Sequence, residues 1–289
     1  MKQPLFTGVC TALVTPFIYE RINYVMLDKL LERQLKAGIK SIVLSGTTGE
    51  SPTLSDDEKA ELIYHAKSVV GNDCIIVAGT GTNNTTHAIQ LSQNALQAGA
   101  DALLVVSPYY NKGNEDGLYL HFSAIADAAQ LPVILYNVPS RTGMDVPVTV
   151  YERLSRKENI IGVKEAIQDI TKIGKIRNKC PNDFYIWSGN DDQIVPVISM
   201  GGKGVISVLA NICPEETLNM AEAALHGDYK TASRIQSTLM PLISALFSEV
   251  NPIPIKYALK IKGFDCGNCR LPLGTLSAAK RETIVALLN

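Results

Sequence analysis

Long apolar stretches are missing from this sequence. No segment reaches the roughly 18 consecutive apolar residues that a membrane-spanning helix needs, and the longest candidate, residues 239–247, is about half that length. Residues 1–8 also lack the apolar core of a secretory signal. The two absences predict a cytoplasmic protein that neither spans a membrane nor is secreted.

A concentration of positive charge is missing as well. The formal net charge is -1, and the lysines and arginines form no cluster. Proteins that bind nucleic acids need a basic face to neutralise phosphates, so we expect no nucleic-acid partner.

A complete set of metal ligands is also absent. Of six cysteines, only Cys266 and Cys269 have the C-x-x-C spacing of a redox or metal pair. A structural zinc site needs four ligands, and no second such pair or pair of histidines completes this one. We interpret the two cysteines as a reduced pair without function, with an accessory redox or metal role as the alternative.

What the sequence does contain is a regular alternation of short apolar runs with longer amphipathic segments. Most runs begin roughly 24 to 34 residues apart, which is the length of one βα unit. Their continuous hydrophobicity is typical of parallel strands covered on both faces. The eight runs are residues 9–14, 41–44, 74–78, 102–106, 133–136, 160–164, 184–187 and 204–208.

The segments between the runs carry helix signals. Residues 27–35 have apolar side chains at helical spacing and end before Gly38, a residue suited to a helix C-terminus. Ser55 and Glu58 have the spacing of a capping box at a helix start. Residues 84–97 repeat the helical pattern.

Eight βα units in a row, in a chain of 289 residues, favour a closed (β/α)8 barrel, or TIM barrel. A doubly wound open sheet is the competing interpretation, but no GxGxxG turn follows the first run. Only helical patterns follow the eighth run. We therefore predict a catalytic barrel over residues 1–224 and a small C-terminal helical domain over residues 225–289.

The active site of such a barrel lies at the carboxyl ends of its strands, where the sixth run ends in Lys164. Strict alternation places Ile160, Gly162 and Lys164 on one face, and Gly162 would leave space beneath the lysine. If that face points inward, apolar walls favour the neutral amine, which is the form that attacks a carbonyl. The alternative is a surface lysine just beyond a strand.

Polar side chains also follow three other runs. Tyr136 ends the fifth run, and its hydroxyl can pass protons, although a packing role is the alternative. Arg141, in the next loop, offers a planar fork suited to a carboxylate. Residues 45–51 place two hydroxyls between two glycines, as in a small anion site or an exposed turn. Residues 107–112 contain paired tyrosines, which indicate an interface or a site.

Taken together, these motifs resemble the dihydrodipicolinate synthase (4-hydroxy-tetrahydrodipicolinate synthase) family. They occur in the family's order from residue 8 to about residue 270, which is nearly the whole chain. The motifs are GTTGES (46–51), SPYYN (107–111), YNVPSRTG (136–143), GVKEA (162–166), SGND (188–191) and GVISV (204–208).

The resemblance implies that pyruvate condenses with L-aspartate 4-semialdehyde, a step that feeds diaminopimelate and lysine synthesis. Lys164 would form a Schiff base and then an enamine, without a metal or organic cofactor. The proton relay would comprise Tyr136, Thr47 and Tyr110, the last contributed across a dimer interface. Substrate binding would fall to Thr48 and Ile206 for the pyruvate carboxylate, to Arg141 for the semialdehyde carboxylate, and to Gly189.

The resemblance also implies a homo-oligomer, either a tetramer of two tight dimers or a dimer. Lysine-inhibited members of the family carry a small residue, histidines and a glutamate where this sequence has Pro52, Asp56, Lys59 and His87. A cation at Lys59 and no carboxylate at His87 disfavour an incoming ammonium group. Weak or absent feedback inhibition by lysine is therefore expected.

Two other functions remain open. Another pyruvate-dependent aldolase, such as N-acetylneuraminate lyase or a 2-keto-3-deoxy sugar acid aldolase, would share the lysine and the tyrosine. Arg141 in its loop, and Thr47 before Thr48, favour the synthase. A barrel that binds a ligand without catalysis is the other alternative, although all the expected catalytic groups are present.

Overall fold

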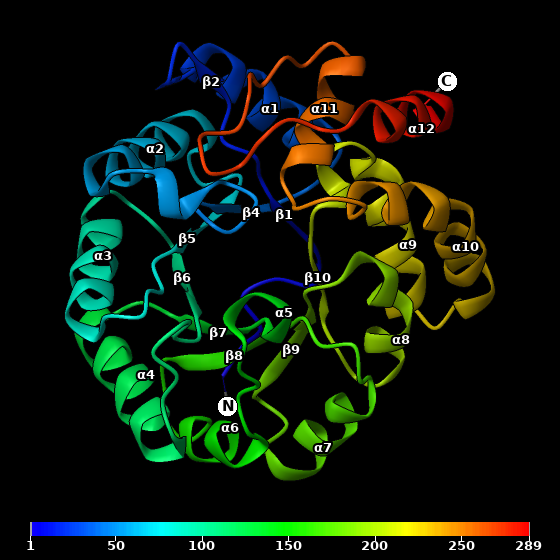
Figure 1. Ribbon diagram of the computed structural model, residues 1–289. Helices are drawn as coiled ribbons and strands as arrows, with labels where there is room; N and C mark the ends of the chain where they lie inside the picture. The colour runs from blue at the N-terminus through cyan, green and yellow to red at the C-terminus, as the bar shows by residue number, and fades with distance from the viewer. Residues whose placement is uncertain (1, 289) are drawn as a thin grey trace.

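The computed structural model describes residues 2–288 and contains a closed barrel of eight parallel strands (Figure 1). The strands pair in chain order, and β10 pairs with β1 to close the ring. They are β1 (Gly8–Ala12), β4 (Ser41–Leu44), β5 (Ile75–Gly79), β6 (Ala102–Val106), β7 (Val133–Asn137), β8 (Ile160–Glu165), β9 (Tyr185–Ser188) and β10 (Gly204–Ser207). Each predicted run overlaps one strand, so the predicted (β/α)8 barrel is confirmed.

A helix follows each strand, and the helices form a ring outside the barrel (Figure 1). The eight helices of this ring are α1 (Tyr24–Lys36), α2 (Asp56–Val70), α3 (Thr85–Gln97), α4 (Glu115–Ala129), α6 (Val148–Leu154), α7 (Thr171–Lys179), α8 (Ile194–Ser199) and α9 (Pro214–Leu225).

The local sequence explains where several helices begin and end. The Ser55 hydroxyl accepts a hydrogen bond from the Glu58 backbone and the Glu58 carboxylate accepts one from the Ser55 backbone, so the predicted capping box is present. The Asn84 side chain caps α3. Gly38 and Gly99 follow α1 and α3 with φ of 87° and 91°, a conformation that glycine adopts without strain.

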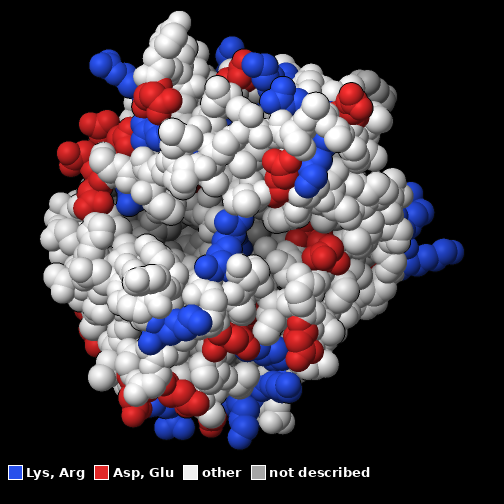
Figure 2. Space-filling view, viewed as in Figure 1, with Lys and Arg blue, Asp and Glu red and all other residues white. Residues whose placement is uncertain are grey.

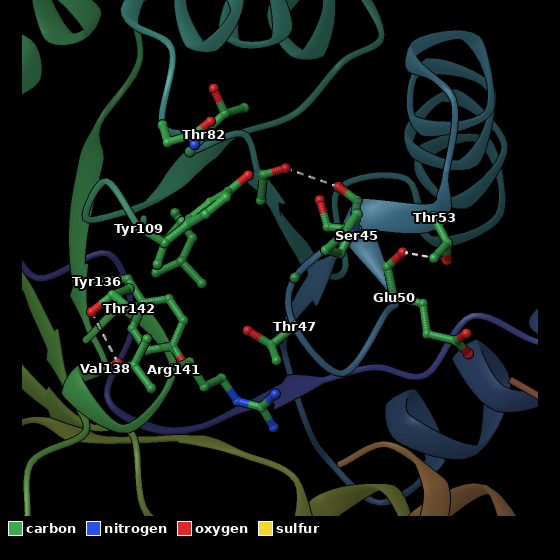
Figure 3. Close-up of a pocket in the computed structure, with 18 of the residues that line it drawn as sticks. Ser45, Thr47, Glu50, Thr53, Thr82, Tyr109, Tyr136, Val138, Arg141 and Thr142 are labelled. Atoms are coloured by element: carbon green, nitrogen blue, oxygen red, sulfur yellow. Dashed lines mark hydrogen bonds between the residues drawn. The ribbon is translucent and has the colours of Figure 1, made fainter. Parts of the chain in front are cut away.

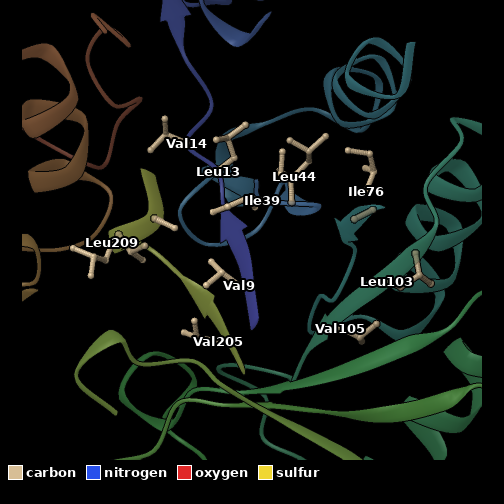
Figure 4. Close-up of a cluster of buried hydrophobic side chains, with 14 of the residues drawn as sticks. Val9, Leu13, Val14, Ile39, Leu44, Ile76, Leu103, Val105, Val205 and Leu209 are labelled. Carbon is tan, nitrogen blue, oxygen red and sulfur yellow. The ribbon is translucent and has the colours of Figure 1, made fainter. Parts of the chain in front are cut away.

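Two sets of buried side chains explain the continuous hydrophobicity of the strands. One set fills the interior of the barrel. The other set, part of which is drawn in Figure 4, packs the strands against the helices. Both faces of the sheet are therefore buried, as expected for a parallel sheet. The interior set includes Cys10, Val43, Val77, Leu104, Ile134, Trp187 and Ile206, and the outer set includes Val9, Leu44, Ile76, Leu103 and Val205.

The N-terminal segment closes the barrel at the amino ends of the strands. Phe6 stacks on Trp187 with ring centroids 5.0 Å apart, and the Trp187 indole N–H donates to the Phe6 carbonyl. The Lys2 Nζ donates to the carbonyl of Ile160, the first residue of β8, and the Lys2 carbonyl accepts from the Tyr185 hydroxyl. Ligands must therefore reach the interior from the opposite, carboxyl end.

Three further helices follow the ring, namely α10 (Tyr229–Leu246), α11 (Ile253–Ile261) and α12 (Ala278–Leu288). α10 packs against α8 and α9, and α12 packs against α10 and α11. The division into residues 1–224 and 225–289 stays a prediction. No helix within residues 2–288 is long and apolar enough to cross a membrane.

Several short elements were not predicted. β2 (Phe17–Ile18) and β3 (Arg21–Ile22) form a hairpin after β1, and α5 (Pro139–Thr142) is a single helical turn after β7. Segments of two to four residues are too short to show a period in the sequence.

Candidate active site

A cavity of about 450 Å³ opens at the carboxyl ends of the strands. Loops after β4, β5, β6 and β7 line it, and Asn251, Pro272 and Leu273 from the C-terminal part of the chain complete its wall. Figure 2 shows a hollow near the centre of this face with basic side chains at its rim. In Figure 3, Thr47, Tyr109, Tyr136 and Arg141 lie around the same space.

Lys164 and Tyr136 lie directly opposite each other on neighbouring strands of the barrel. They are paired in the register of β7 and β8, and Lys164 is also paired with Trp187 of β9. Tyr136 and Trp187 belong to the interior set, so Lys164 points inward too. Lys164 is only 5% exposed, and its Nζ lies 4.3 Å from the centroid of the Tyr136 ring. A buried amine thus borders a phenol that lines the cavity.

A bulge in β8 changes one detail of the sequence prediction. The register skips Ile161 between Ile160 and Gly162, so Ile160 packs against the helices and Ile161 enters the interior. The predicted common face of Ile160 and Lys164 is therefore wrong. Glycine is required at position 162 by the neighbouring strand, because an added Cβ would lie 2.1 Å from the Tyr185 carbonyl oxygen. Gly162 thus permits the close approach of β8 and β9.

Gly189 provides the space for Lys164 that was expected from Gly162. A Cβ on Gly189 would lie 2.6 Å from the Ala166 Cβ and 3.1 Å from the Lys164 Cε. Gly189 follows β9 directly, at the carboxyl end of the neighbouring strand. A side chain at this position would displace the lysine.

The loop after β4 carries Thr47, which belongs to the cavity lining, and Thr48, which does not. The buried Thr48 hydroxyl accepts a hydrogen bond of 2.9 Å from the Asn251 amide. Glu50 attaches this loop to the C-terminal part of the chain. Its carboxylate lies 2.5 Å from the Lys256 Nζ of α11 and accepts a hydrogen bond from the Arg270 backbone.

Arg141 lies at the rim of the cavity on α5. Its side chain is exposed and lines the cavity, and its Nη2 donates to the Asn251 carbonyl at 3.2 Å. The short helix is held by the Thr142 hydroxyl, which donates to the Val138 carbonyl, and it ends at Gly143 with φ of 69°. The guanidinium is therefore fixed near the mouth, where a carboxylate can reach it.

The two adjacent tyrosines of the loop after β6 have different environments. Tyr109 lines the cavity, whereas Tyr110 has a φ of 68° and is 92% exposed. Within the single chain Tyr110 does not join Thr47 and Tyr136 at the cavity. A Tyr110 ring on the surface is what a contribution to a neighbouring subunit would require.

Ile206 lies in the interior near the end of β10. The loop that follows β10 is held by buried Asp191, to which the sequence analysis assigned no role. The Asp191 carboxylate accepts hydrogen bonds from the Ser207 hydroxyl and from the backbones of Val208 and Leu209. Burial raises the pKa of Asp191, and these hydrogen bonds oppose that shift. Asp191 thus positions the backbone that follows Ile206.

Behind Lys164, a buried polar cluster on the outer face of the barrel was also missed. Glu165 accepts hydrogen bonds from the Asn137 amide and the Tyr151 hydroxyl, and its Oε2 lies 3.3 Å from the Lys172 Nζ. Burial raises the pKa of Glu165 to about 7. Since Glu165 and Asn137 adjoin Lys164 and Tyr136 in the chain, the cluster ties together the strand ends that carry the site.

One arm of the cavity reaches α2 and α3. Pro52, Lys59 and His87 line it, and Asp56 contacts both basic side chains: its oxygens lie 3.7 Å from the Lys59 Nζ and 2.8 Å from the His87 Nε2. Burial lowers the pKa of Lys59, and Asp56 partly opposes this. This arm therefore combines one carboxylate with two groups that can carry positive charge.

The cysteines lie outside the cavity lining. All six are free, and burial raises the pKa values of Cys266 and Cys269 to about 12. Both are therefore protonated thiols of low nucleophilicity at neutral pH. Among residues 2–288, no group of three or more His, Cys, Asp or Glu side chains is arranged to hold a metal ion.

Comparison with known proteins identifies the family. The model of the dihydrodipicolinate synthetase family matches residues 5–289. The 4-hydroxy-tetrahydrodipicolinate synthase of Acetivibrio thermocellus is 44% identical over 289 residues, which cover 100% of this chain and 98% of that protein. The synthase of the same name from Clostridium perfringens is 46% identical over 269 residues, or 93% of this chain and 92% of its own.

A solved structure agrees with these relatives. The 4-hydroxy-tetrahydrodipicolinate synthase of Methylacidiphilum fumariolicum SolV superposes with a TM-score of 0.96 at 40% identity, covering 98% of this chain and 95% of its own. Sequence, fold and cavity thus lead to the same assignment. This chain belongs to the dihydrodipicolinate synthetase family.

Proposed function

We propose that this enzyme condenses pyruvate with L-aspartate 4-semialdehyde through a Schiff base on Lys164, as a 4-hydroxy-tetrahydrodipicolinate synthase of lysine biosynthesis. One observation carries the proposal: the Lys164 Nζ is buried 4.3 Å from the centroid of the Tyr136 ring, beside a cavity that is closed at its far end. The family membership and the names of the relatives support it.

Pyruvate binds first at the bottom of the cavity. Its carboxylate meets Thr48 and the backbone at Ile206, and Gly189 leaves room for the adduct on Lys164. The neutral amine attacks the keto carbon to give a carbinolamine, and loss of one water gives the imine. Tyr136, whose ring lies beside the Lys164 amine, protonates the leaving hydroxyl of the carbinolamine.

Loss of a proton from the pyruvate methyl group converts the imine to an enamine. The enamine carbon attacks the aldehyde carbon, and the new alkoxide takes a proton from the relay. The α-ammonium group gives one proton to the relay, and the resulting amine attacks the imine carbon. The Lys164 nitrogen takes up a proton from the attacking nitrogen and leaves as the free amine, with the cyclic product released. The protonated imine is the electron sink, so these steps need no metal or organic cofactor.

The proton relay comprises Thr47 and Tyr136 of one subunit and Tyr110 of a second subunit. The 92% exposure of Tyr110 supports this arrangement, because the side chain is free to enter a neighbouring cavity. The enzyme therefore acts as a homo-oligomer, either a tetramer of two tight dimers or a dimer. A cytoplasmic location stays a prediction.

Reductive trapping tests the proposal. Borohydride added with pyruvate should leave a reduced adduct on Lys164, located by peptide mass mapping, and Lys164→Ala should form none. Turnover of L-aspartate 4-semialdehyde should exceed cleavage of N-acetylneuraminate. An adduct with the opposite substrate preference would indicate a sugar acid aldolase, and no adduct at all would indicate a binding protein.

A further inference from the structure

Asn251 joins the two residues to which the proposed function assigns substrate carboxylates. It lies between α10 and α11, lines the cavity and is 4% exposed. Its amide donates to the Thr48 hydroxyl at 2.9 Å, and its backbone carbonyl accepts from Arg141 at 3.2 Å. Since the Thr48 oxygen accepts from Asn251, its own proton stays available for the pyruvate carboxylate.

The other end of the Asn251 amide has no partner. Its Oδ1 is buried and receives no hydrogen bond from any residue between 2 and 288. A buried carbonyl oxygen without a donor is rare in folded proteins and calls for a donor from outside the chain, either a water or a ligand. Because Asn251 is part of the cavity wall, a molecule in the cavity can supply that donor.

The substrates differ in whether they carry such a donor. Pyruvate has only acceptor oxygens, whereas the semialdehyde bears an α-ammonium group on the carbon that holds its carboxylate. Arg141 receives that carboxylate in the proposed function, and Asn251 is bonded to Arg141. An ammonium group offers three donors and forms a strong charge-assisted hydrogen bond to a carbonyl oxygen.

We propose that the Asn251 Oδ1 accepts a hydrogen bond from the α-ammonium group of the aldehyde substrate, and that Asn251 thereby selects amino aldehydes. This inference rests on the proposed function. The rival explanation is that Asn251 only positions Thr48 and Arg141 and never touches the substrate.

A pair of substrates separates the two explanations. Succinic semialdehyde has the same chain and carboxylate as L-aspartate 4-semialdehyde but no amino group. Asn251→Leu keeps the approximate volume and removes the acceptor, whereas Asn251→Asp keeps an acceptor. The measurement is kcat/KM for each aldehyde at saturating pyruvate; if succinic semialdehyde acts only as a competitive inhibitor, its inhibition constant replaces its kcat/KM.

For Asn251→Leu we expect about a 10- to 100-fold larger loss with the amino aldehyde than with succinic semialdehyde, as for one charge-assisted hydrogen bond. Asn251→Asp should retain the preference for the amino aldehyde. Equal losses with both aldehydes, or no loss, would overturn the inference.

Two controls keep the result interpretable. An undiminished borohydride-trapped adduct of pyruvate on Lys164 shows that each variant is folded with an intact first half-reaction. If the wild-type enzyme forms this adduct but does not turn over L-aspartate 4-semialdehyde, the proposed function fails and the inference fails with it. Wild-type turnover with unchanged discrimination in Asn251→Leu overturns the inference alone.

Discussion

At the scale of single residues, Gly189 is the position where a small change reaches the chemistry most directly. Gly189→Ala puts a Cβ 2.6 Å from Ala166 and 3.1 Å from the Lys164 Cε, so the lysine must shift. We expect kcat/KM to fall about 100-fold, because misplacement of a reacting group by about 1 Å has that cost.

Steady-state kinetics together with the rate of borohydride trapping measure this effect. Gly274→Ala is the matched control, since a Cβ there would meet nothing within 4 Å, and it should behave as the wild type. A Gly189→Ala enzyme that traps pyruvate at the wild-type rate would contradict this prediction, because it would show that Lys164 can accommodate the added methyl group without losing reactivity.

His121 is expected to make the fold sensitive to acid. Burial lowers the pKa of His121 from 6.5 to about 4. Its Nδ1 contacts the Thr85 hydroxyl, and its buried Nε2 has no partner among residues 2–288. Between these pH values the unfolded chain binds a proton that the folded protein does not bind. The contribution of His121 to stability should therefore fall as the pH drops from 6.5 to 4, by about 3 kcal/mol, while Glu165, whose pKa is raised to about 7, contributes in the opposite direction.

Denaturant unfolding at several pH values tests this contribution. His121→Gln should remove most of that slope, and His226→Gln, at an exposed residue that ends α9, should leave it unchanged. Identical slopes for wild type and His121→Gln would contradict the assignment.

The residues that sequence reasoning located share one property, which is position at a strand end. Lys164 and Tyr136 close apolar runs, so barrel geometry alone brings them together. Asn251 could not be found this way, because its partner Thr48 lies 203 residues earlier in the chain. The predicted inward face of Ile160 was wrong because a bulge in β8 leaves no trace in apolar periodicity.

At the scale of elements, one buried ion pair connects the loop after β4 to α11. The side chains of Glu50 and Lys256 are 0% and 3% exposed, and they lie 2.5 Å apart. Lys256→Met leaves the Glu50 charge buried without its counterion. We expect the free energy of unfolding to fall by about 3–5 kcal/mol, measured by denaturant titration.

Two variants frame this result. The double variant Glu50→Gln with Lys256→Met carries no buried charge and should be more stable than Lys256→Met alone. Lys260→Met breaks the exposed Lys260–Asp265 pair and should change stability by less than about 1 kcal/mol. Equal effects of Lys256→Met and Lys260→Met would mean that burial adds nothing to the first pair.

Strands were easier to predict than the loops between them. Continuous apolar runs and a capping box at Ser55 are local signals, and the structure contains both the strands and the cap. The β2–β3 hairpin and α5 have two to four residues per element and give no such signal. The Glu50–Lys256 pair depends on how the C-terminal helices return to the barrel, which no local pattern specifies.

The arm of the cavity between α2 and α3 leads to a prediction about regulation. Lys59 and His87 both contact the Asp56 carboxylate, so an added lysine meets an acidic group that is already paired with basic side chains. We expect no half-maximal inhibition at submillimolar L-lysine in a coupled turnover assay. Half-maximal inhibition at a submillimolar concentration of L-lysine would refute this prediction.

At the scale of the whole molecule, the exposed Tyr110 predicts that subunits share their sites. Neither Tyr110→Phe nor Lys164→Ala should have substantial activity alone. Mixed dimers of the two variants would contain one complete site, formed by Lys164 of one subunit and Tyr110 of the other. Random assortment should restore about a quarter of wild-type activity, because half of the dimers are mixed.

Co-refolding the two variants and assaying turnover measures this complementation. Gly274→Ala mixed with Lys164→Ala gives the reference for subunits whose Tyr110 is intact. Activity that never exceeds that of the separate variants would place Tyr110 in its own subunit's site, or away from catalysis.

The packing of Phe6 and Lys2 under the barrel has a kinetic consequence. The cavity opens only at the carboxyl ends of the strands, so the reactant that binds at its bottom must enter first. The residues assigned to pyruvate are buried, whereas Arg141 is exposed at the rim. An aldehyde that arrived early would block the way to the amine. The two reactants should therefore enter in a fixed order, keto acid before aldehyde, and excess aldehyde should slow turnover by occupying the entrance.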